Sequence, residues 1–337
     1  MRVLGIETSC DETAAAVVED GVRTLSGVVA TQHELHEQFG GVVPEIACRA
    51  HVESLLPVIC RALEEAGTPL EALDGVAVTT TPGLIGALLV GVTTAKALSW
   101  SLGVPLVAVN HLHAHVYAVW LDGEAPPLPA VSLVASGGHT SLFLTEGPLE
   151  QTHLGGTVDD AAGEAFDKVA HILRLGYPGG PAIERAAREG DPRAIGFPRS
   201  GLGDPEVRFS FSGLKTAVLY HCLGQNASRG DIAAASYGPQ FVADVAASFQ
   251  EAVVDVLVGK TCDAARRQMA ESIIVGGGVA ANGRLRERMR QEADRMGVEL
   301  RLAPLALCTD NAAMTAGLGC RMLAAGRAAS LDVEVVP

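Results

Sequence analysis

The sequence predicts an α/β protein of two similar lobes, and two observations lead to this fold class. Apolar runs typical of β-strands alternate with helical patterns, which favours largely parallel sheets. The pattern that opens the chain also restarts after residue 129. With 337 residues, of which 48% are hydrophobic, the chain can bury one large core or two smaller ones, and two domains are the better expectation.

The first lobe is expected at residues 1–129, completed by a C-terminal helix at 311–327. Three consecutive strands open it before any helix appears, at 3–7, 14–19 and 24–30. The helices and strands that then alternate are expected at 52–66, 75–79, 86–102 and 105–109. This alternation is what indicates parallel strands.

A proline-rich link at residues 126–129 marks the expected domain boundary. The second lobe, at 130–310, begins as the first does, with strands at 130–135 and 140–145 joined by a short polar turn. A helical insertion is expected at about 155–235. The pattern of strands and turns repeats although the amino-acid sequence does not, so we interpret the chain as a duplicated fold.

Composition favours a cytoplasmic protein. Acidic residues appear near the N-terminus before any apolar signal region develops, and the longest apolar stretches, at 86–92 and 273–275, are too short to span a bilayer. The seven cysteines include no CxxC pair, which argues against a disulfide framework or a zinc ribbon and fits a reducing compartment.

The formal net charge of −14 limits how the chain can hold nucleic acid. An acidic protein needs a local basic patch or a basic partner to bind RNA. One candidate patch is Arg284, Arg286, Arg288 and Arg290 on a single predicted helix. An ordinary solvated helix face is the alternative, because acidic residues follow.

Two histidines follow the apolar run at 105–109, where polar Asn110 ends a predicted strand. Strand ends are where sites form in α/β proteins. If a helix begins there, His111 and His115 lie on one face of it, about 6 Å apart by Cβ, whereas His113 points away. Such a pair can share a metal ion; the alternative is that both imidazoles hydrogen-bond to nearby carbonyls.

A carboxylate far downstream completes a candidate metal site. Asp310 lies where Thr309 or Asp310 itself is expected to cap a closing helix. Two histidines and one carboxylate leave coordination positions open, which suits a catalytic metal better than a structural one.

Small polar turns join the first two strands of both lobes. Thr8 and Ser9 offer hydroxyl donors, and Gly137 and Gly138 let backbone N–H groups approach an anion. A glycine run at 276–278 follows a later strand; taken alone it indicates a tight turn as readily as a nucleotide site. Together these features resemble the actin, Hsp70 and sugar-kinase superfamily, which implies a nucleotide and metal site between the lobes.

A more specific resemblance covers nearly the whole chain, and it is to the TsaD family of bacterial tRNA N6-adenosine threonylcarbamoyltransferases. The motifs that carry it are GIETSCDET at 5–13, GGVVPEIACRAHV at 40–52, PGLIGALLVG at 82–91, HLHAH at 111–115, SGGHT at 136–140, DDAAGEAFDKVA at 159–170, YPGGP at 177–181, FSFSGLKT at 209–216, GGGVAAN at 276–282 and CTDNAAM at 308–314.

This resemblance implies an acyl transfer. Threonylcarbamoyl-AMP donates its threonylcarbamoyl group to N6 of adenosine 37, in tRNAs that read codons beginning with A, and AMP is released. The implied cofactor is one divalent ion per subunit, Fe²⁺ or Zn²⁺, held by His111, His115 and Asp310. ATP, ADP or AMP is expected to fit the same pocket as the substrate.

The resemblance also implies substrate-binding residues. They are Val134, Ala135, Ser136, Gly137, Gly138, Asp167, Gly180, Glu184 and Asn282. Two have plain alternatives: Asp167 as a helix-surface carboxylate and Asn282 as a helix cap. Archaeal and eukaryotic relatives carry a tyrosine, which can add a metal ligand, at the place of Val134, whose side chain cannot coordinate a metal.

Asp11 and Glu12, on the first predicted turn, are the candidate catalytic residues. They can orient water or metal near an anion, or accept a proton as the amine attacks, and the alternative is a pair of solvated turn acids. Lys215 is a candidate partner for substrate charge, with a surface salt bridge as its alternative.

The implied partners are tRNA, a TsaB-type paralogue that forms a heterodimer through the helix at 86–102, and a TsaE-type ATPase; no membrane is expected. Three rival classes of protein remain. A metalloprotease needs the HExxH glutamate, but position 112 is leucine. A kinase or chaperone of the same superfamily does not account for the histidine pair. A catalytically empty subunit is expected to lack the three metal ligands.

Overall fold

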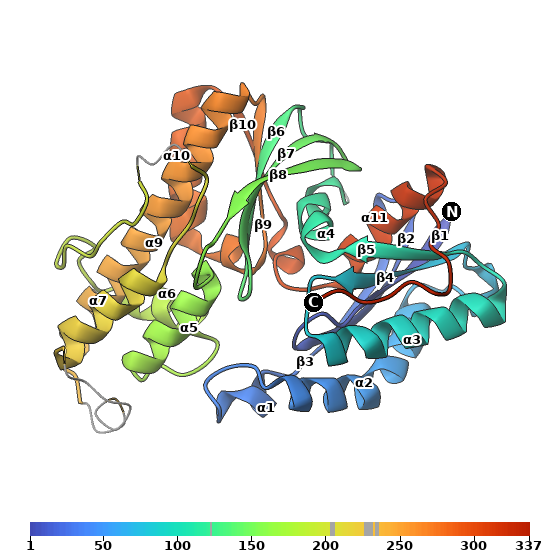
Figure 1. Cartoon of the computed structure of the whole chain (residues 1–337), viewed down its shortest axis with the longest axis horizontal. Helices are drawn as coiled ribbons and strands as arrows, with labels where there is room; N and C mark the ends of the chain where they lie inside the picture. Colours follow the sequence, from blue (N-terminus) through green and yellow to red (C-terminus); the bar gives the residue numbers. More distant parts are fainter. Residues whose placement is uncertain (122, 203–205, 226–231, 233–235) are drawn as a thin grey trace. The chain divides into compact units, whose positions relative to one another are not determined.

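The computed structural model describes residues 1–121, 123–202, 206–225, 232 and 236–337. The chain divides into two compact units. Unit 1 contains Met1–Pro126, Gly147–Gln151 and Ala303–Pro337, and unit 2 contains Pro127–Glu146 and Thr152–Leu302. Each unit is built around a five-stranded sheet (Figure 1).

Unit 1 has a mixed sheet in the order β3-β2-β1-β4-β5, in which β1 pairs antiparallel with β2 and parallel with β4. Its strands are β1 (Arg2–Glu7), β2 (Glu12–Glu19), β3 (Arg23–Thr31), β4 (Gly75–Thr81) and β5 (Leu106–Asn110). Its helices are α1 (His33–Glu37), α2 (Pro44–Glu65), α3 (Ile85–Leu102), α4 (His111–Tyr117) and α11 (Ala312–Ala324). Short 3-10 turns lie at Leu70–Ala72, Ala118–Trp120 and Leu305–Leu307.

Helices cover both faces of this sheet, with α2 and α3 on one side and α11 on the other (Figure 1). Apolar side chains such as Leu4, Ile6 and Val76 are fully buried between these layers. The approach of α11 to β1 depends on Gly5, because a Cβ there would lie 2.3 Å from the carbonyl oxygen of Ala312. This contact fixes the segment that carries Asp310 against the centre of the sheet.

Unit 2 repeats the arrangement with the order β8-β7-β6-β9-β10. Its strands are β6 (Ala130–Ala135), β7 (Thr140–Gly147), β8 (Glu150–Gly156), β9 (Ser272–Gly276) and β10 (Glu299–Leu302). Its helices are α5 (Ala162–Ile172), α6 (Gly179–Ala187), α7 (Ser212–Leu223), α9 (Pro239–Gln268) and α10 (Gly283–Met296), with a 3-10 turn at Gly278–Ala281. As in unit 1, the first strand is central, with a hairpin on one side and parallel strands on the other. The predicted duplication is therefore confirmed at the level of topology.

Some local predictions are wrong. Helix α2 begins at Pro44 instead of residue 52, because proline at the first helical position needs no N–H partner. The cap of α11 is Asn311, not Thr309 or Asp310: its side chain accepts a hydrogen bond from the N–H of Met314 at 3.0 Å.

The prediction that every apolar stretch is too short to span a bilayer also needs correction. Helix α3 has the length and apolar composition to cross a membrane, although only a third of it is buried. In unit 1 it packs against β4 and α2, so the same composition fits a core helix of an α/β layer.

Candidate functional site

The two histidines of the predicted pair lie on one face of α4. Asn110, the last residue of β5, caps this helix because its Oδ1 accepts hydrogen bonds from the N–H groups of Leu112 at 2.9 Å and His113 at 3.1 Å. The helix therefore begins at His111, and one turn later His115 brings its ring to a centroid distance of 4.6 Å. The prediction that a helix pairs these imidazoles is confirmed.

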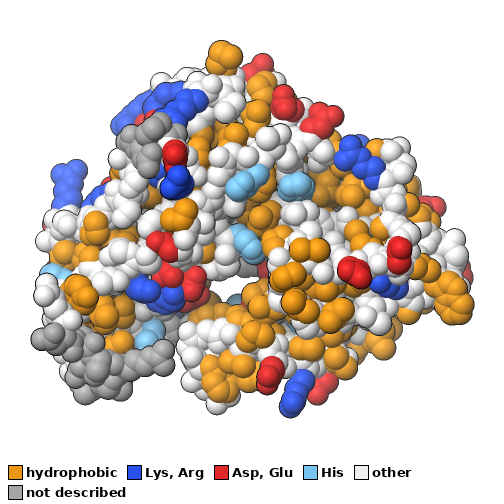
Figure 2. Space-filling view, viewed as in Figure 1, with side chains coloured by type: hydrophobic (Ala, Val, Ile, Leu, Met, Phe, Trp, Pro, Cys, Tyr) orange, Lys and Arg blue, Asp and Glu red, His pale blue; other side chains and the backbone are white. Residues whose placement is uncertain are grey.

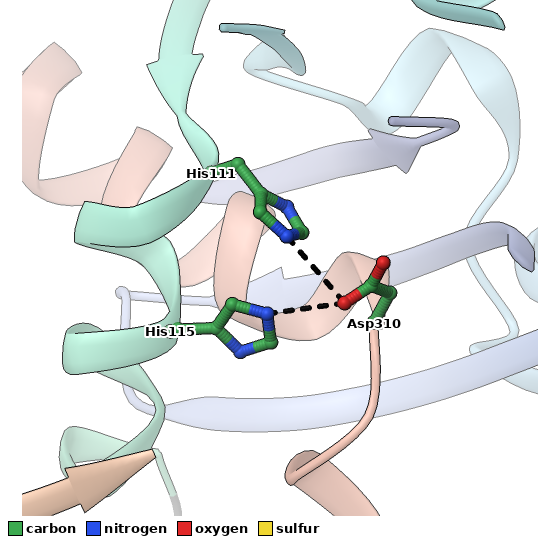
Figure 3. A group of neighbouring side chains, drawn as sticks. All are labelled: His111, His115 and Asp310. Atoms are coloured by element: carbon green, nitrogen blue, oxygen red, sulfur yellow. Dashed lines mark hydrogen bonds and ion pairs between the residues drawn. The ribbon is translucent and has the colours of Figure 1, made fainter. Parts of the chain in front are cut away.

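Asp310 joins the pair from the other end of the chain (Figure 3). Its Oδ1 lies 3.1 Å from Nε2 of His115 and 3.5 Å from Nε2 of His111. Both imidazoles are buried, and the carboxylate is mostly buried. A metal ion with bonds of about 2.0–2.2 Å would hold neighbouring ligand atoms about 3.0–3.5 Å apart, so these separations fit one ion.

Glu7, which the sequence did not single out, supports the pair from behind. Its Oε2 lies 3.1 Å from Nδ1 of His111 and also accepts a hydrogen bond from the hydroxyl of Thr79 at 2.6 Å. A carboxylate on one ring nitrogen fixes the tautomer and leaves the other nitrogen to bind metal. The signal in the sequence is a single acid that ends the apolar strand β1, at the edge where sites form.

Burial and charge set the protonation of the cluster. Burial lowers the pKa of His111, but the carboxylates of Asp310 and Glu7 outweigh it and hold that pKa well above its ordinary value. Burial, together with the neighbouring His111, lowers the pKa of His115. Burial opposes ionisation of Asp310, but His111 and His115 hold the pKa of this carboxyl well below its usual range. Among the described residues, the buried Nδ1 of His115 has no hydrogen-bond partner. The donor set of two imidazoles and a carboxylate, with one imidazole held by Glu7, fits a divalent metal.

Asp11 and Glu12 lie on the β1–β2 turn and are only 7% and 8% exposed, so they are not solvated turn acids. The turn is held by buried His51, whose Nε2 donates to the carbonyl of Cys10 at 2.9 Å and whose Nδ1 accepts from the hydroxyl of Thr13 at 2.8 Å. Burial raises the pKa of Glu12 to about 8, and the charges of Asp310 and Asp11 add to this, against a hydrogen bond from His33.

The predicted substrate residues all belong to unit 2. At the β6–β7 turn, Gly137 and Gly138 have open space where a Cβ would be, so a ligand can approach the backbone. The carbonyls of Ser136 and Gly137 accept hydrogen bonds from the first turn of α5, at 3.1 Å each. Val134 and Ala135 are fully buried in β6, so they can offer a ligand only their backbone.

The other predicted substrate residues cluster where α6 and α10 begin. Asp167 Oδ1 accepts from the N–H of Gly179 at 2.7 Å, and the neighbouring Gly180 faces open space. Glu184 Oε1 accepts from the N–H of Gly283 at 3.1 Å. Asn282 caps α10 through Leu285 at 3.0 Å and donates its amide to Gln250 at 2.8 Å, which confirms the predicted cap.

The candidate cationic residues are engaged in ion pairs. Lys215 lies 3.0 Å from a carboxylate oxygen of Asp160, which is the surface salt bridge given as its alternative. Arg284 makes two hydrogen bonds to Glu251, and Arg288 also contacts that carboxylate. For these two arginines, the interpretation as an ordinary charged helix face is therefore the better one.

Similar solved structures identify the fold class of this chain. This chain is similar to HypF from T. kodakarensis with a TM-score of 0.61 and 16% identity, over 96% of this chain and 48% of that one. It is also similar to component A of (R)-2-hydroxyglutaryl-CoA dehydratase from Acidaminococcus fermentans, with a TM-score of 0.52 and 14% identity, over 96% and 99% of the two chains. At these identities the likeness shows the fold alone, which is the predicted actin-like ATPase and sugar-kinase fold.

The family follows from the sequence comparisons. Residues 23–317 match the model of the TsaD family, tRNA N6-adenosine threonylcarbamoyltransferase. A relative of that name from Symbiobacterium thermophilum is 52% identical over 99% of this chain and 95% of its own length. Another relative of that name, from Anaeromyxobacter dehalogenans, is 51% identical over 100% of this chain and 98% of its own length. The chain belongs to the TsaD family, and it is a transferase of tRNA modification; the kinase and metalloprotease alternatives are not favoured.

Proposed function

We propose that this chain transfers the threonylcarbamoyl group of threonylcarbamoyl-AMP to N6 of adenosine 37 in tRNAs that read codons beginning with A. The products are N6-threonylcarbamoyladenosine and AMP. The observation that carries the proposal is the His111–His115–Asp310 cluster in a chain of this family. A kinase or chaperone has no evident use for two buried imidazoles aimed at one carboxylate.

We assign the metal of the family to this cluster, as Fe²⁺ or Zn²⁺, both of which accept imidazole and carboxylate ligands. When bound, the ion supplies positive charge that polarises a carbonyl or phosphoryl oxygen. Glu7 holds the ring of His111 in the orientation that presents Nε2, and the capped α4 keeps the two imidazoles in register. Buried side chains lose little further freedom on binding, which favours tight retention.

Unit 2 carries the residues that we assign to the activated adenylate. The open backbone at Gly137 and Gly138 suits an anionic group, and Ser136 adds a hydroxyl. Asp167, Gly180, Glu184 and Asn282 border the starts of α6 and α10, where Gly180 leaves space for a ligand. Val134 and Ala135 contribute backbone only.

Asp11 and Glu12 are the proposed catalytic carboxylates. The attacking amine must lose a proton during acyl transfer, and a buried carboxylate held on a rigid turn is suited to accept it. His51 supplies the rigidity by bonding to both Cys10 and Thr13. The remaining barrier is lowered by positioning the two reactants.

The proposed partners are tRNA, a TsaB-type paralogue and a TsaE-type ATPase, in the cytoplasm. The face for the paralogue is the exposed apolar surface of α2 and α3, which includes Val52, Leu56, Ile85, Leu89 and Trp100. Figure 2 shows hydrophobic side chains gathered over the region where Figure 1 draws these helices. A patch of this kind favours a protein partner. Because the chain is acidic, we expect basic partners to supply much of the attraction for tRNA.

The test is a reconstituted transfer assay. The chain is combined with its two protein partners, threonylcarbamoyl-AMP and unmodified tRNA, and the modified nucleoside is measured by mass spectrometry. Wild type and the control His113→Ala, which alters the histidine between the two ligands, are expected to form product. His111→Ala is expected to lose at least 100-fold in rate. Absence of product from wild type in every mixture would overturn the proposal.

A further inference from the structure

A second group of metal-ligating side chains lies at the β1–β2 turn, apart from the His111–His115–Asp310 cluster. Asp11 and Glu12 belong to this turn, and His33 opens α1. One ligand atom from each residue lies within 4.8 Å of the other two. We propose that Asp11, Glu12 and His33 form a second divalent-cation site, of the kind that takes Mn²⁺. This goes beyond the proposed function and does not depend on the acyl transfer.

Strand pairing explains why these residues meet. Glu12, at the start of β2, pairs with Thr31, at the end of β3, and His33 follows two residues later. The N–H of Gln32 donates to the carbonyl of Asp11 at 3.2 Å, which ties the two segments together. His51 holds the far side of the turn. The three ligands are therefore preorganised by the backbone, as a metal site requires.

The distances and burial suit a bound cation. Nε2 of His33 lies 3.2 Å from Oε1 of Glu12, which is the separation of neighbouring ligands on one ion with bonds of about 2.1 Å. Both carboxylates are more than nine-tenths buried, whereas the His33 side chain is 37% exposed and gives the site an entrance. Two carboxylates and one imidazole suit Mn²⁺, which accepts both oxygen and nitrogen ligands.

The negative charge around Asp11 and Glu12 also favours a bound cation. The negative charges that act on Glu12 include those of both Asp11 and Asp310, which belong to the same unit. These like charges repel one another, and a bound divalent ion would offset them.

The test counts Mn²⁺ bound to the metal-free full-length chain, from the loss of the free-ion signal in electron paramagnetic resonance. We expect two Mn²⁺ per wild-type chain, one in His115→Ala, one in His33→Ala and none in the double variant. The control His153→Ala removes an exposed histidine of unit 2 and should retain two. Glu12→Gln, which keeps the shape of the side chain, should behave as His33→Ala does.

Two outcomes would overturn the proposal. One is a His33→Ala chain that still binds two ions with affinity within tenfold of wild type. The other is a wild-type chain that binds no ion, or binds only one ion that His115→Ala removes. Thermal unfolding of each variant establishes that it is folded, and because His33 is partly exposed on a five-residue helix, we expect its replacement to leave the unfolding temperature unchanged.

Discussion

Replacing Glu7 by glutamine tests whether the carboxylate behind His111 tunes the metal centre. Glu7 is fully buried, and its oxygens accept from Thr79, from the N–H of Ser9 at 2.7 Å and from the His111 ring. Glutamine keeps the size but removes the charge, so the imidazole becomes a weaker and less fixed ligand. Loss of such a partner typically weakens metal binding about 10- to 100-fold, which is about 1.4–2.7 kcal/mol.

The assay is competition of the purified chain with a chelator of known affinity, using Zn²⁺ as the probe. Thr79→Val is the matched control, because it removes one donor to Glu7 and leaves the charge and the His111 contact in place. We expect it to change zinc affinity less than Glu7→Gln does, because it removes one hydrogen bond to Glu7 and keeps the negative charge beside His111. Equal affinities of wild type and Glu7→Gln would refute the role of Glu7.

Three further predictions concern stability. Asn110→Ala removes the cap of α4 and should cost about 1 kcal/mol, measured by urea unfolding; an unchanged midpoint would contradict the cap. Gly5→Ala places a Cβ against Ala312 and should cost about 2–3 kcal/mol in the same assay, whereas a neutral result would mean that α11 moves freely. The hydrogen bond from Arg284 lowers the pKa of Glu251 in the folded chain. This interaction therefore stabilises the fold by about 1 kcal/mol above the ordinary glutamate pKa of about 4.3. The stabilisation is lost as the pH falls through the lower pKa that Glu251 has in the folded chain. Unfolding of wild type and Glu251→Gln should therefore differ at pH 7, and the difference should shrink as the pH falls below the ordinary glutamate pKa.

The parts of the site that could be predicted are those determined by a short stretch of sequence. A polar residue at a strand end followed by histidines four apart predicted the ligand face of α4, since helical geometry alone brings His111 and His115 together. The role of Glu7 depends on which residues β1 meets across the sheet, and no local pattern records that. The same holds for His33, which reaches Glu12 only through the register of β2 and β3.

The wrong predictions have equally specific causes. Thr309, Asp310 and Asn311 are all competent caps, and the structure selects Asn311, whose amide also donates to the carbonyls of Leu307 and Thr309. This leaves the Asp310 side chain free of a capping duty and aimed at the histidines. Helix α2 was expected too late because its first two turns bury Ala47 and His51, a small and a polar side chain, instead of large apolar ones.

The placement of α11 bears on how the chain matures during synthesis. Helix α11 packs on β1 in unit 1, yet it follows the whole of unit 2 in the sequence. Until it emerges from the ribosome, the nascent N-terminal sheet has one apolar face bare, while residues 127–302 already have the strands they need. Asp310 lies just before this helix, so the proposed metal site is complete only after the C-terminal segment of unit 1 has been synthesised.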